Sequence, residues 1–198
     1  MNYPNGVKLH KQKQINYSNR GMVLEADLNE TNNYYLVNDI AVIHKKPTPI
    51  TIKKVDYISP QKAKIKDAYF QKASTTDYNG IYRGKYIDFE AKETKDKNCF
   101  PLRNIHKHQI DHLRKIIKHG GIGFLIVRFV NYNKTFFLDG KDFMNFLKNN
   151  KRKSIPYSYF NEKGYILEIK YNPRLDYLKI IDEIYFKGEY YEEKISKN

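Results

Sequence analysis

The sequence predicts one domain of mixed α and β structure. The chain has 198 residues, of which 40% are hydrophobic, so it holds enough apolar material for one sizeable core and is close to the usual length of a single domain. Short β-prone runs alternate with segments whose apolar residues recur at helical spacing. No repeats or low-complexity tracts interrupt this order. We therefore expect one compact mixed domain.

The first expected elements are a helix and a short strand. The helix should begin near Gly21, after the candidate caps Ser18 and Asn19, with one apolar face made of Leu24, Leu28 and Tyr35. Residues 40–43 have the pattern of a buried strand, and the breaker at 47–49, which contains two prolines, ends it. The chain must change direction at this breaker.

A basic hairpin is predicted next. Two β-prone runs, residues 50–57 and 63–70, flank a polar turn with Ser59 and Pro60. The runs show little alternation between polar and apolar positions, so we expect a protruding ribbon that is not packed on both faces. A solvated edge hairpin without a ligand is the alternative, because exposed edges often carry lysine to prevent aggregation.

The remaining elements complete an α/β order. A second hairpin turns at Arg83-Gly84, and a helix ends at Gly120-Gly121. After it we expect a strand, a second strand, a short helix, a basic loop from Lys151, a third strand and a helix beyond Pro173. The first two strands are residues 123–131 and 135–138, and the short helix is 141–148. The third strand is 165–169, and the last helix carries Leu175, Leu178 and Ile181.

Charge distribution suggests the domain boundaries. Residues 1–18 contain lysines and no acid, as expected for a flexible basic arm, and acidic residues gather toward the end of the chain. We assign residues 19–180 to a single domain with the predicted basic ribbon inserted at about 47–73. Residues 181–198 are then a C-terminal tail.

Composition also restricts the partner and the compartment. The 36 Lys and Arg residues outnumber the 22 Asp and Glu residues, and the net charge of +14 favours a polyanionic partner, nucleic acid rather than a membrane. No run approaches 18 apolar residues, and the N-terminus lacks the apolar segment of a signal peptide, so we expect a cytoplasmic protein. Cys99 is the only cysteine, which excludes an internal disulfide and a zinc site built on paired thiolates.

The second hairpin carries the candidate chemistry. If Arg83-Gly84 is a two-residue turn, counting outward along the ladder places Asp77 opposite Glu90. Opposed residues have β-carbons about 4.5 to 5.5 Å apart, which allows both carboxylates to hold one hard cation. Strand alternation puts Lys92 on the same face as Glu90. The spacing therefore predicts a cluster of two acids and a lysine.

This cluster suits phosphodiester hydrolysis. Mg²⁺ can bind a phosphate oxygen and activate water, while a lysine positions or deprotonates that water or neutralises charge in the transition state. Two alternatives stay open: Asp88 shares the Glu90 face and competes for the metal, and a turn at Asn79-Gly80 would remove the pairing. His108 and His112 lie one helical turn apart, but without an HExxH pattern phosphate contact is favoured over zinc.

Several strings resemble RecU-type Holliday junction resolvases in order and spacing, and together they cover all but the ends of the chain. They are Asn19-Arg20-Gly21-Met22 with Glu25, His44-Lys45-Lys46-Pro47-Thr48-Pro49, Thr75-Thr76-Asp77-Tyr78-Asn79-Gly80, Ile87-Asp88-Phe89-Glu90-Ala91-Lys92-Glu93-Thr94, Phe100-Pro101-Leu102 before His108-Gln109-Ile110, and Pro173-Arg174-Leu175-Asp176-Tyr177.

The resemblance implies a restriction-endonuclease-like core, a central mixed sheet flanked by helices, in a homodimer whose two-stranded stalks project toward the centre of a four-way DNA junction. It implies an endonuclease that makes symmetric nicks during homologous recombination and repair. Mg²⁺ is the implied cofactor, with Mn²⁺ as a substitute. A RecA-type recombinase and a branch-migration helicase are the implied protein partners.

The resemblance also assigns roles to single residues. It makes Asp77 and Glu90 metal ligands and Lys92 the catalytic lysine, with Glu25 and Gln109 completing the active site. Thr75 falls two positions before Asp77 on the predicted face, so we add it as a supporting contact to metal or phosphate. Two of these residues have structural alternatives. Gln109 lies on the core-facing edge of its helix, and Glu25 suits a helix N-terminus.

Basic residues on the arm, the stalk and the loop at 151–153 are expected to hold DNA phosphates. Tyr69 and Phe70, near the stalk base, either stack on unpaired bases or pack against the core, and we favour packing. Two rival functions remain, a restriction-type or repair endonuclease acting on duplex DNA and a non-catalytic modulator of the recombinase. The DNA-binding candidates are Arg20, Lys45, Lys46, Lys53, Lys54, Lys62, Lys64 and Lys66.

Overall fold

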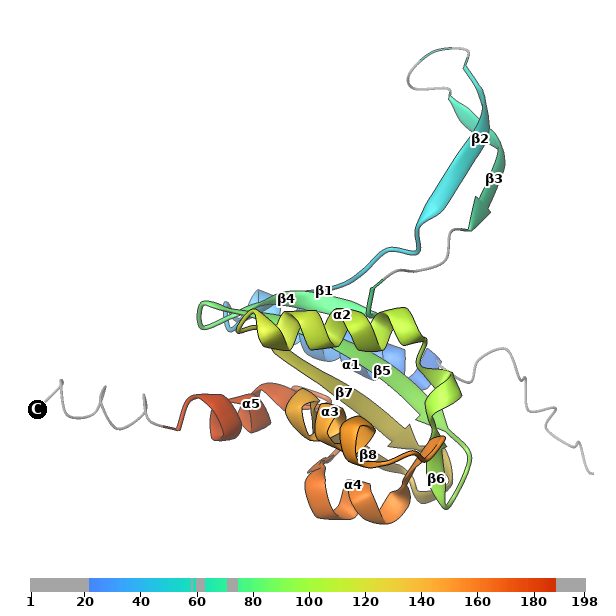
Figure 1. The fold of residues 1–198 in the computed structure, drawn as a ribbon. Coiled ribbons are helices and arrows are strands. Elements are labelled where there is room, and N and C mark those ends of the chain that lie inside the picture. The colour runs from blue at the N-terminus through green and yellow to red at the C-terminus, as the bar shows by residue number, and fades with distance from the viewer. Residues whose placement is uncertain (1–21, 58, 60–62, 71–74, 188–198) are drawn as a thin grey trace, which may run out of the picture.

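A computed structural model describes residues 22–57, 59, 63–70 and 75–187. A central sheet has helices on both faces, and a hairpin projects away from it (Figure 1). Strands β5 and β7 are parallel and the other neighbours are antiparallel, so the predicted mixed α/β fold with a central mixed sheet is confirmed. The six strands, in sheet order, are β1 (Val42–Lys45), β4 (Tyr78–Tyr82), β5 (Lys85–Thr94), β7 (Ile122–Phe129), β8 (Lys134–Asp139) and β10 (Tyr165–Leu167).

Strand β7 divides the interior into two cores. Every residue of β7 is buried. Because successive side chains of a strand point to opposite faces, the two halves of its hydrophobic set enter different cores. Ile122, Phe124 and Ile126 enter one core, and Leu125, Val127 and Phe129 enter the other.

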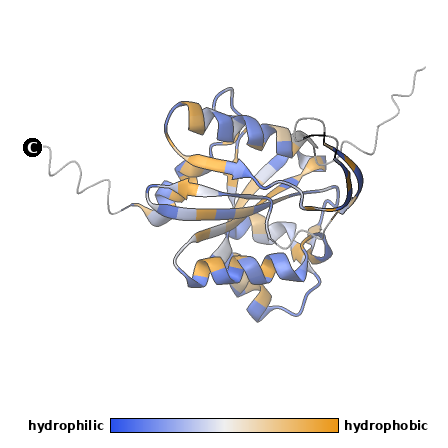
Figure 2. Cartoon of the chain, turned by 90° about the horizontal axis from the view of Figure 1, so that it is seen from above, coloured by the Kyte–Doolittle hydropathy of each residue, from blue (hydrophilic) through white to orange (hydrophobic). Residues whose placement is uncertain are grey.

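Helices cover each core. The first core packs against α1 (Met22–Val37) and α5 (Tyr177–Tyr185), and the second against α2 (Lys107–Lys118), α3 (Gly140–Asn149) and α4 (Tyr157–Lys163). Figure 2 shows hydrophobic residues recurring along the strands between the two helical layers, whereas the helices mix hydrophobic and hydrophilic positions. Burying one apolar side of each helix against the sheet is therefore the main packing device of the domain.

The N-terminal helix follows the prediction, and the strand after it does not. Leu24, Leu28 and Tyr35 of α1 are all buried; Ser18 and Asn19 lie outside the described residues. The buried strand expected at residues 40–43 is wrong, because β1 starts at Val42 and only Ile43 of its four residues is buried. Among the described residues, strand β1 pairs only with β4 and forms an edge of the sheet, and three of its four residues are exposed.

The projecting hairpin, here called the stalk, consists of β2 (Ile50–Asp56) and β3 (Lys64–Phe70), which pair with each other outside the main sheet (Figure 1). Every residue of β3 is exposed, which confirms the expected protruding ribbon. Tyr69 is 50% and Phe70 is 77% exposed, so the preference for packing against the core is wrong. Among the described residues the ribbon has no third strand to cover its aromatic face.

The C-terminal part holds more structure than the sequence indicated. Strand β9 (Ser154–Pro156) and helix α4 lie where only a basic loop was expected, and β9 forms a small sheet with β6 (Cys99–Pro101). Helix α5 runs to Tyr185, and Ile181 and Phe186 are buried in the first core, so the domain extends beyond the boundary placed at residue 180. Within the described ranges, no helix is both long and apolar enough to cross a membrane.

Candidate active site

The turn between β4 and β5 sets the register of the site. Arg83 and Gly84 have φ angles of 47° and 72°, both left-handed, which is the conformation of a two-residue type I′ turn. The strands pair in the predicted register, ending with Tyr78 opposite Phe89. The predicted hairpin ladder is therefore confirmed as far as the Tyr78–Phe89 pair. Asp77 directly precedes Tyr78 and Glu90 directly follows Phe89, so both acids lie one position beyond this last pair.

Gly80 has a different reason to be glycine. It lies within β4, opposite Ile43 of β1. A Cβ at residue 80 would clash with the backbone of Val42 and Ile43. The glycine therefore permits the close approach of β1, and the alternative turn at Asn79-Gly80 is excluded.

Lys92 lies between two carboxylates. Its Nζ atom is 3.1 Å from Oδ2 of Asp77 and forms a second ion pair with Oε1 of Glu90. The main-chain N–H of Ala91 donates to the same Oδ2 of Asp77, at 3.2 Å. The structure thus brings Asp77, Glu90 and Lys92 together, as the hairpin register predicts.

Gln109 joins the cluster from α2. Its Oε1 atom accepts a hydrogen bond from the main-chain N–H of His106 at 2.9 Å, which caps the helix. Because the oxygen is used in this way, the amide nitrogen faces the sheet and donates to Oε1 of Glu90 at 2.7 Å. Gln109 is 4% exposed. Its buried position serves both the helix cap and the orientation of Glu90.

The charge of Glu90 is unfavourable where it lies. The side chain is fully buried. Burial and the neighbouring Asp77 carboxylate together raise the pKa of Glu90 to about 8. Burial would lower the pKa of Lys92, but the carboxylates of Glu90 and Asp77 outweigh it and raise that pKa. The cluster therefore favours additional positive charge beside its acids.

The two acids fit a hard divalent cation. Oε2 of Glu90 is buried and has no hydrogen-bond partner among the described residues, an arrangement that costs free energy unless a cation or donor compensates it. No group of three or more His, Cys, Asp or Glu side chains converges within the described ranges. Mg²⁺ often binds through one or two carboxylates and keeps several waters, so Asp77 and Glu90 form a suitable pair.

Glu25 approaches the cluster from the first turn of α1. Glu25, Lys45, Asp77 and Lys92 all line one cavity of about 220 Å³. The carboxylate of Glu25 accepts a 2.5 Å hydrogen bond from Nζ of Lys45. The structure thus brings Glu25 to the predicted site, and it pairs Lys45, an expected DNA contact, with that acid.

The two threonines that precede Asp77 differ in burial. Thr75 is half-buried, whereas the adjacent Thr76 is buried and donates its hydroxyl to Oδ1 of Asp88. Asp88 does share the face of Glu90, as expected, but its carboxylate is engaged by protein donors. Sequence reasoning missed Thr76. The only feature of the sequence that points to Thr76 is its position directly before Asp77.

Apart from Lys45, the predicted DNA contacts fall into three groups. Arg20 and Lys62 lie outside the described residues. The ammonium group of Lys46 turns inward to the buried Asp88 at 2.7 Å, where it serves as the counter-ion of that carboxylate, and its contact with DNA stays a prediction. On the stalk, Lys66 pairs with Asp56 at 2.8 Å, and Nζ of Lys53 lies 5.2 Å from the centroid of the Tyr69 ring. The other stalk candidates, Lys54 and Lys64, are exposed on β2 and β3.

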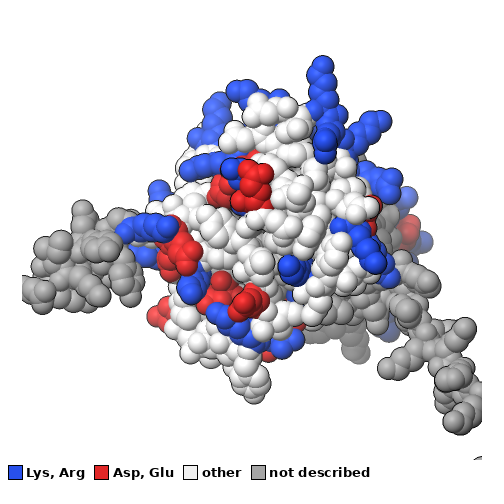
Figure 3. Space-filling model, turned by 90° about the horizontal axis from the view of Figure 1, so that it is seen from below, with Lys and Arg blue, Asp and Glu red and all other residues white. Residues whose placement is uncertain are grey.

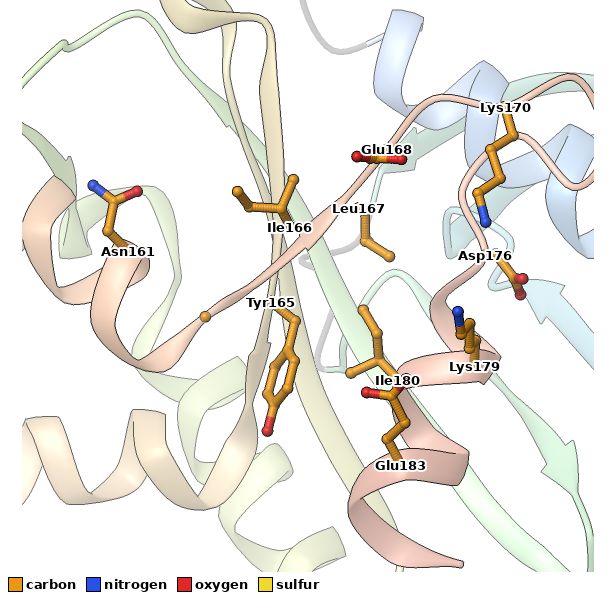
Figure 4. Close-up of a pocket in the computed structure, with 11 residues that line it drawn as sticks. Asn161, Tyr165, Ile166, Leu167, Glu168, Lys170, Asp176, Lys179, Ile180 and Glu183 are labelled. Atoms are coloured by element: carbon orange, nitrogen blue, oxygen red, sulfur yellow. The ribbon is translucent and has the colours of Figure 1, made fainter. Parts of the chain in front are cut away.

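A separate cavity lies between β10 and α5 (Figure 4). Its volume is about 460 Å³. Acidic Glu168, Asp176 and Glu183 line it together with Lys170 and Lys179, so neither charge sign dominates. It shares no lining residue with the cavity beside Asp77 and Lys92, and we do not include it in the active site.

The mixed sheet and its cluster of two acids and a lysine fit the class of metal-dependent nucleases. A family model described as RecU: Recombination protein U matches residues 19–183. The chain belongs to the RecU family.

Curated relatives agree with this membership. Holliday junction resolvase RecU of Geobacillus sp. (strain WCH70) is 50% identical over 196 residues, which cover 93% of this chain and 97% of the relative. The protein of that name from Bacillus cytotoxicus is 50% identical over 195 residues, covering 93% and 98%. A solved structure of Hjc, a Holliday junction resolvase from Archaeoglobus fulgidus, has a TM-score of 0.42 and 12% identity over 74% of this chain and 95% of that chain.

Proposed function

We propose that the protein is a Holliday junction resolvase, a structure-selective endonuclease that nicks four-way DNA junctions during homologous recombination and DNA repair. The observation that carries this proposal is the meeting of Asp77, Glu90 and Lys92 in a chain of the RecU family. This cluster also favours a nuclease over a non-catalytic modulator of the recombinase, because a binding protein has no need for two acids that repel each other.

The proposed reaction is Mg²⁺-dependent hydrolysis of a phosphodiester, with Mn²⁺ as a substitute metal. Asp77 and Glu90 would hold the ion, which supplies positive charge to the phosphate when bound. Gln109 keeps the Glu90 carboxylate in place through its 2.7 Å hydrogen bond. Lys92, which reaches both acids, supplies a further positive charge beside the phosphate. Thr75 remains a proposed supporting contact to metal or phosphate.

Glu25 and Lys45 contribute from the other side of the 220 Å³ cavity. Their 2.5 Å ion pair is partly exposed, at 41% for the Lys45 side chain and 43% for that of Glu25. A pair with this exposure is weak and can separate at small cost. DNA entering the cavity would then meet the Lys45 ammonium, and Glu25 would be free to orient water or metal.

Junction recognition is proposed for the stalk. It presents exposed lysines on both strands, together with Tyr69 and Phe70, whose rings are available to stack on unpaired bases. The side of the molecule away from the stalk intersperses acidic groups with its lysines and arginines (Figure 3). We therefore place the DNA on the stalk side, with affinity that falls steeply as salt rises.

A homodimer would supply two identical active sites, one for each of two equivalent strands of a four-way junction. This symmetry would produce paired nicks, one from each chain. We further propose that the dimer works in the cytoplasm on chromosomal DNA, with a RecA-type recombinase and a branch-migration helicase as partners.

The test compares cleavage of a four-way junction with cleavage of a linear duplex that contains the same sequence, each in Mg²⁺ and in EDTA. The proposal predicts metal-dependent nicks in two opposing strands of the junction and little cutting of the duplex. Equal cutting of the two substrates would favour a restriction-type or repair endonuclease. Binding without cutting would favour the non-catalytic modulator.

A further inference from the structure

The carboxylate of Asp88 is buried next to the active site and is fully engaged. Asp88 is 0% exposed and lies two residues before Glu90 on the same face of β5. Oδ2 receives Nζ of Lys46 at 2.7 Å, the hydroxyl of Tyr86 at 3.2 Å and Nε2 of His112 at 3.1 Å. Oδ1 accepts the hydroxyl of Thr76.

Two of these donors mark the places where the stalk leaves and rejoins the domain. Lys46 directly follows β1 and precedes β2, whereas Thr76 follows β3 and precedes β4. Nζ of Lys46 also donates to the hydroxyl oxygen of Thr76, at 2.9 Å. Asp88, Lys46 and Thr76 thus form a closed triangle of contacts that joins both ends of the stalk to β5. We call this triangle the stalk clamp.

The stalk clamp is connected to Asp77 through the main chain. Thr76 directly precedes Asp77 in the sequence, and the main-chain N–H of Lys46 donates to the carbonyl oxygen of Asp77 at 2.8 Å. Lys46 therefore contacts the Asp77 backbone with its amide and Asp88 with its ammonium. Asp88 holds Lys46 and Thr76, and these two residues adjoin the main chain of Asp77. The position of the Asp77 carboxylate therefore depends on Asp88.

A purely structural role explains this arrangement poorly. Removing a carboxylate from water costs several kcal/mol, and a buried ion pair often contributes less stability than apolar packing of the same volume. The opposite face of β5 does carry apolar residues, since Ile87 and Phe89 are buried in the first core. The buried charge of Asp88 on the active-site face therefore indicates that Asp88 is needed to fix the position of Asp77.

We propose that Asp88 is a positioning residue for the nuclease reaction, which holds Asp77 in place through Thr76 and Lys46. The proposal rests on the proposed function, in which Asp77 is a metal ligand. Asp88 itself does not ligate the ion, because its oxygens are already used by protein donors. Partners that orient metal ligands typically change metal affinity or activity by about 10- to 100-fold when they are removed.

The test uses Asp88→Asn, which keeps the size of the side chain and removes its charge. Asp139→Asn is the matched control: Asp139 is 4% exposed, accepts hydrogen bonds from the Lys141 N–H and the Tyr185 hydroxyl, and lies outside the active site. Mn²⁺ binding to the full-length, DNA-free protein is measured by electron paramagnetic resonance. Melting temperatures and the Mg²⁺ concentration for half-maximal junction cutting are measured alongside.

Asp88→Asn should weaken Mn²⁺ binding by about 10-fold and raise the half-maximal Mg²⁺ concentration similarly, with the KM for the junction within about twofold of wild type. Asp139→Asn should lose thermal stability without changing the Mn²⁺ affinity. Unchanged Mn²⁺ affinity in Asp88→Asn would overturn the proposal, as would an equal loss in both variants.

A second pair keeps the test decisive if Asp88→Asn does not fold. Thr76→Val removes the hydroxyl and keeps the shape, whereas Thr76→Ser retains the hydroxyl. The proposal predicts weaker Mn²⁺ binding for valine and near wild-type binding for serine; equal binding would overturn it. If the wild-type protein binds Mn²⁺ but does not cut junctions, the proposed function fails while these binding comparisons still judge Asp88.

Discussion

Nε2 of Gln109 donates a 2.7 Å hydrogen bond to Oε1 of Glu90, and the oxygen of the same amide caps helix α2. One side chain therefore fixes the start of a helix and the orientation of Glu90, a proposed metal ligand. Because the main-chain N–H of His106 requires an oxygen opposite it, the amide can present only its nitrogen to Glu90.

This dual role can be separated by two substitutions. Gln109→Glu keeps an oxygen for the His106 N–H but places a second carboxylate against Glu90, whereas Gln109→Ala loses both contacts. Both should cut junctions about 10- to 100-fold more slowly than wild type. Gln109→Ala should also lose about 0.5–1 kcal/mol of stability in urea unfolding, because it loses the cap. Gln109→Glu keeps the cap, so its loss of stability should come from the buried pair of carboxylates and should shrink as the pH falls. Wild-type cutting by Gln109→Glu would contradict the orienting role.

Glu90 should make the metal-free protein less stable as pH rises. Its pKa in the folded state is raised to about 8, from 4.5 for the unperturbed group. Between these values the folded state holds a proton that the unfolded state has released, so stability falls as pH increases. Urea unfolding in EDTA should show this fall between about pH 5 and about pH 8. Glu90→Gln serves as the comparison and should remove most of the slope; an unchanged slope would place its origin elsewhere.

Helix α1, which carries Glu25, should depend on a buried acid for its attachment. Asp27 is 5% exposed and accepts from Nη2 of Arg128 at 2.7 Å and from Nε of Arg174 at 3.2 Å. Asp27→Ala leaves the buried Arg128 without this counter-ion and should cost about 3–5 kcal/mol in chemical denaturation. The exposed pair of Arg114 and Asp111 gives the control, since Arg114→Ala should cost less than about 1 kcal/mol. A similar loss of stability in the two variants would show that the buried Asp27 does not anchor helix α1.

The exposed stalk aromatics should serve DNA rather than stability. Replacing Tyr69 and Phe70 together by alanine should change the melting temperature little, because the rings are 50% and 77% exposed. If they stack on bases, junction affinity in EDTA should fall about 10-fold or more, as expected for about 1–3 kcal/mol per stacked base. Tyr171, which is 88% exposed outside the stalk, provides a matched control. Equal affinity of the double variant and Tyr171→Ala would show that the stalk rings do not stack.

The sequence was most informative where contacts are local. The Arg83-Gly84 turn fixes a ladder over a few residues, so the alignment of Asp77 with Glu90 and Lys92 could be predicted by counting. The apolar stripe of α1 was equally readable, because helical periodicity alone selects Leu24, Leu28 and Tyr35.

Contacts between distant segments could not be read in this way. The stalk clamp joins Lys46 to Asp88 across 42 positions, and nothing in the spacing of either residue indicates the other. The exposure of Tyr69 and Phe70 was misjudged because aromatic residues usually pack, and only the absence of a third strand beside the described ribbon leaves them exposed. The three-residue strands β6 and β9 are too short for alternation to reveal them.

The central claim is that Asp77 and Glu90 hold the metal ion on which cleavage of the junction depends. Its most direct test is the rate of Mg²⁺-dependent nicking of a four-way junction by Asp77→Ala, measured beside its junction affinity in EDTA. We predict an affinity close to that of wild type and nicking slower by about 100-fold or more. An Asp77→Ala protein that binds the junction normally and nicks it at the wild-type rate would contradict the claim.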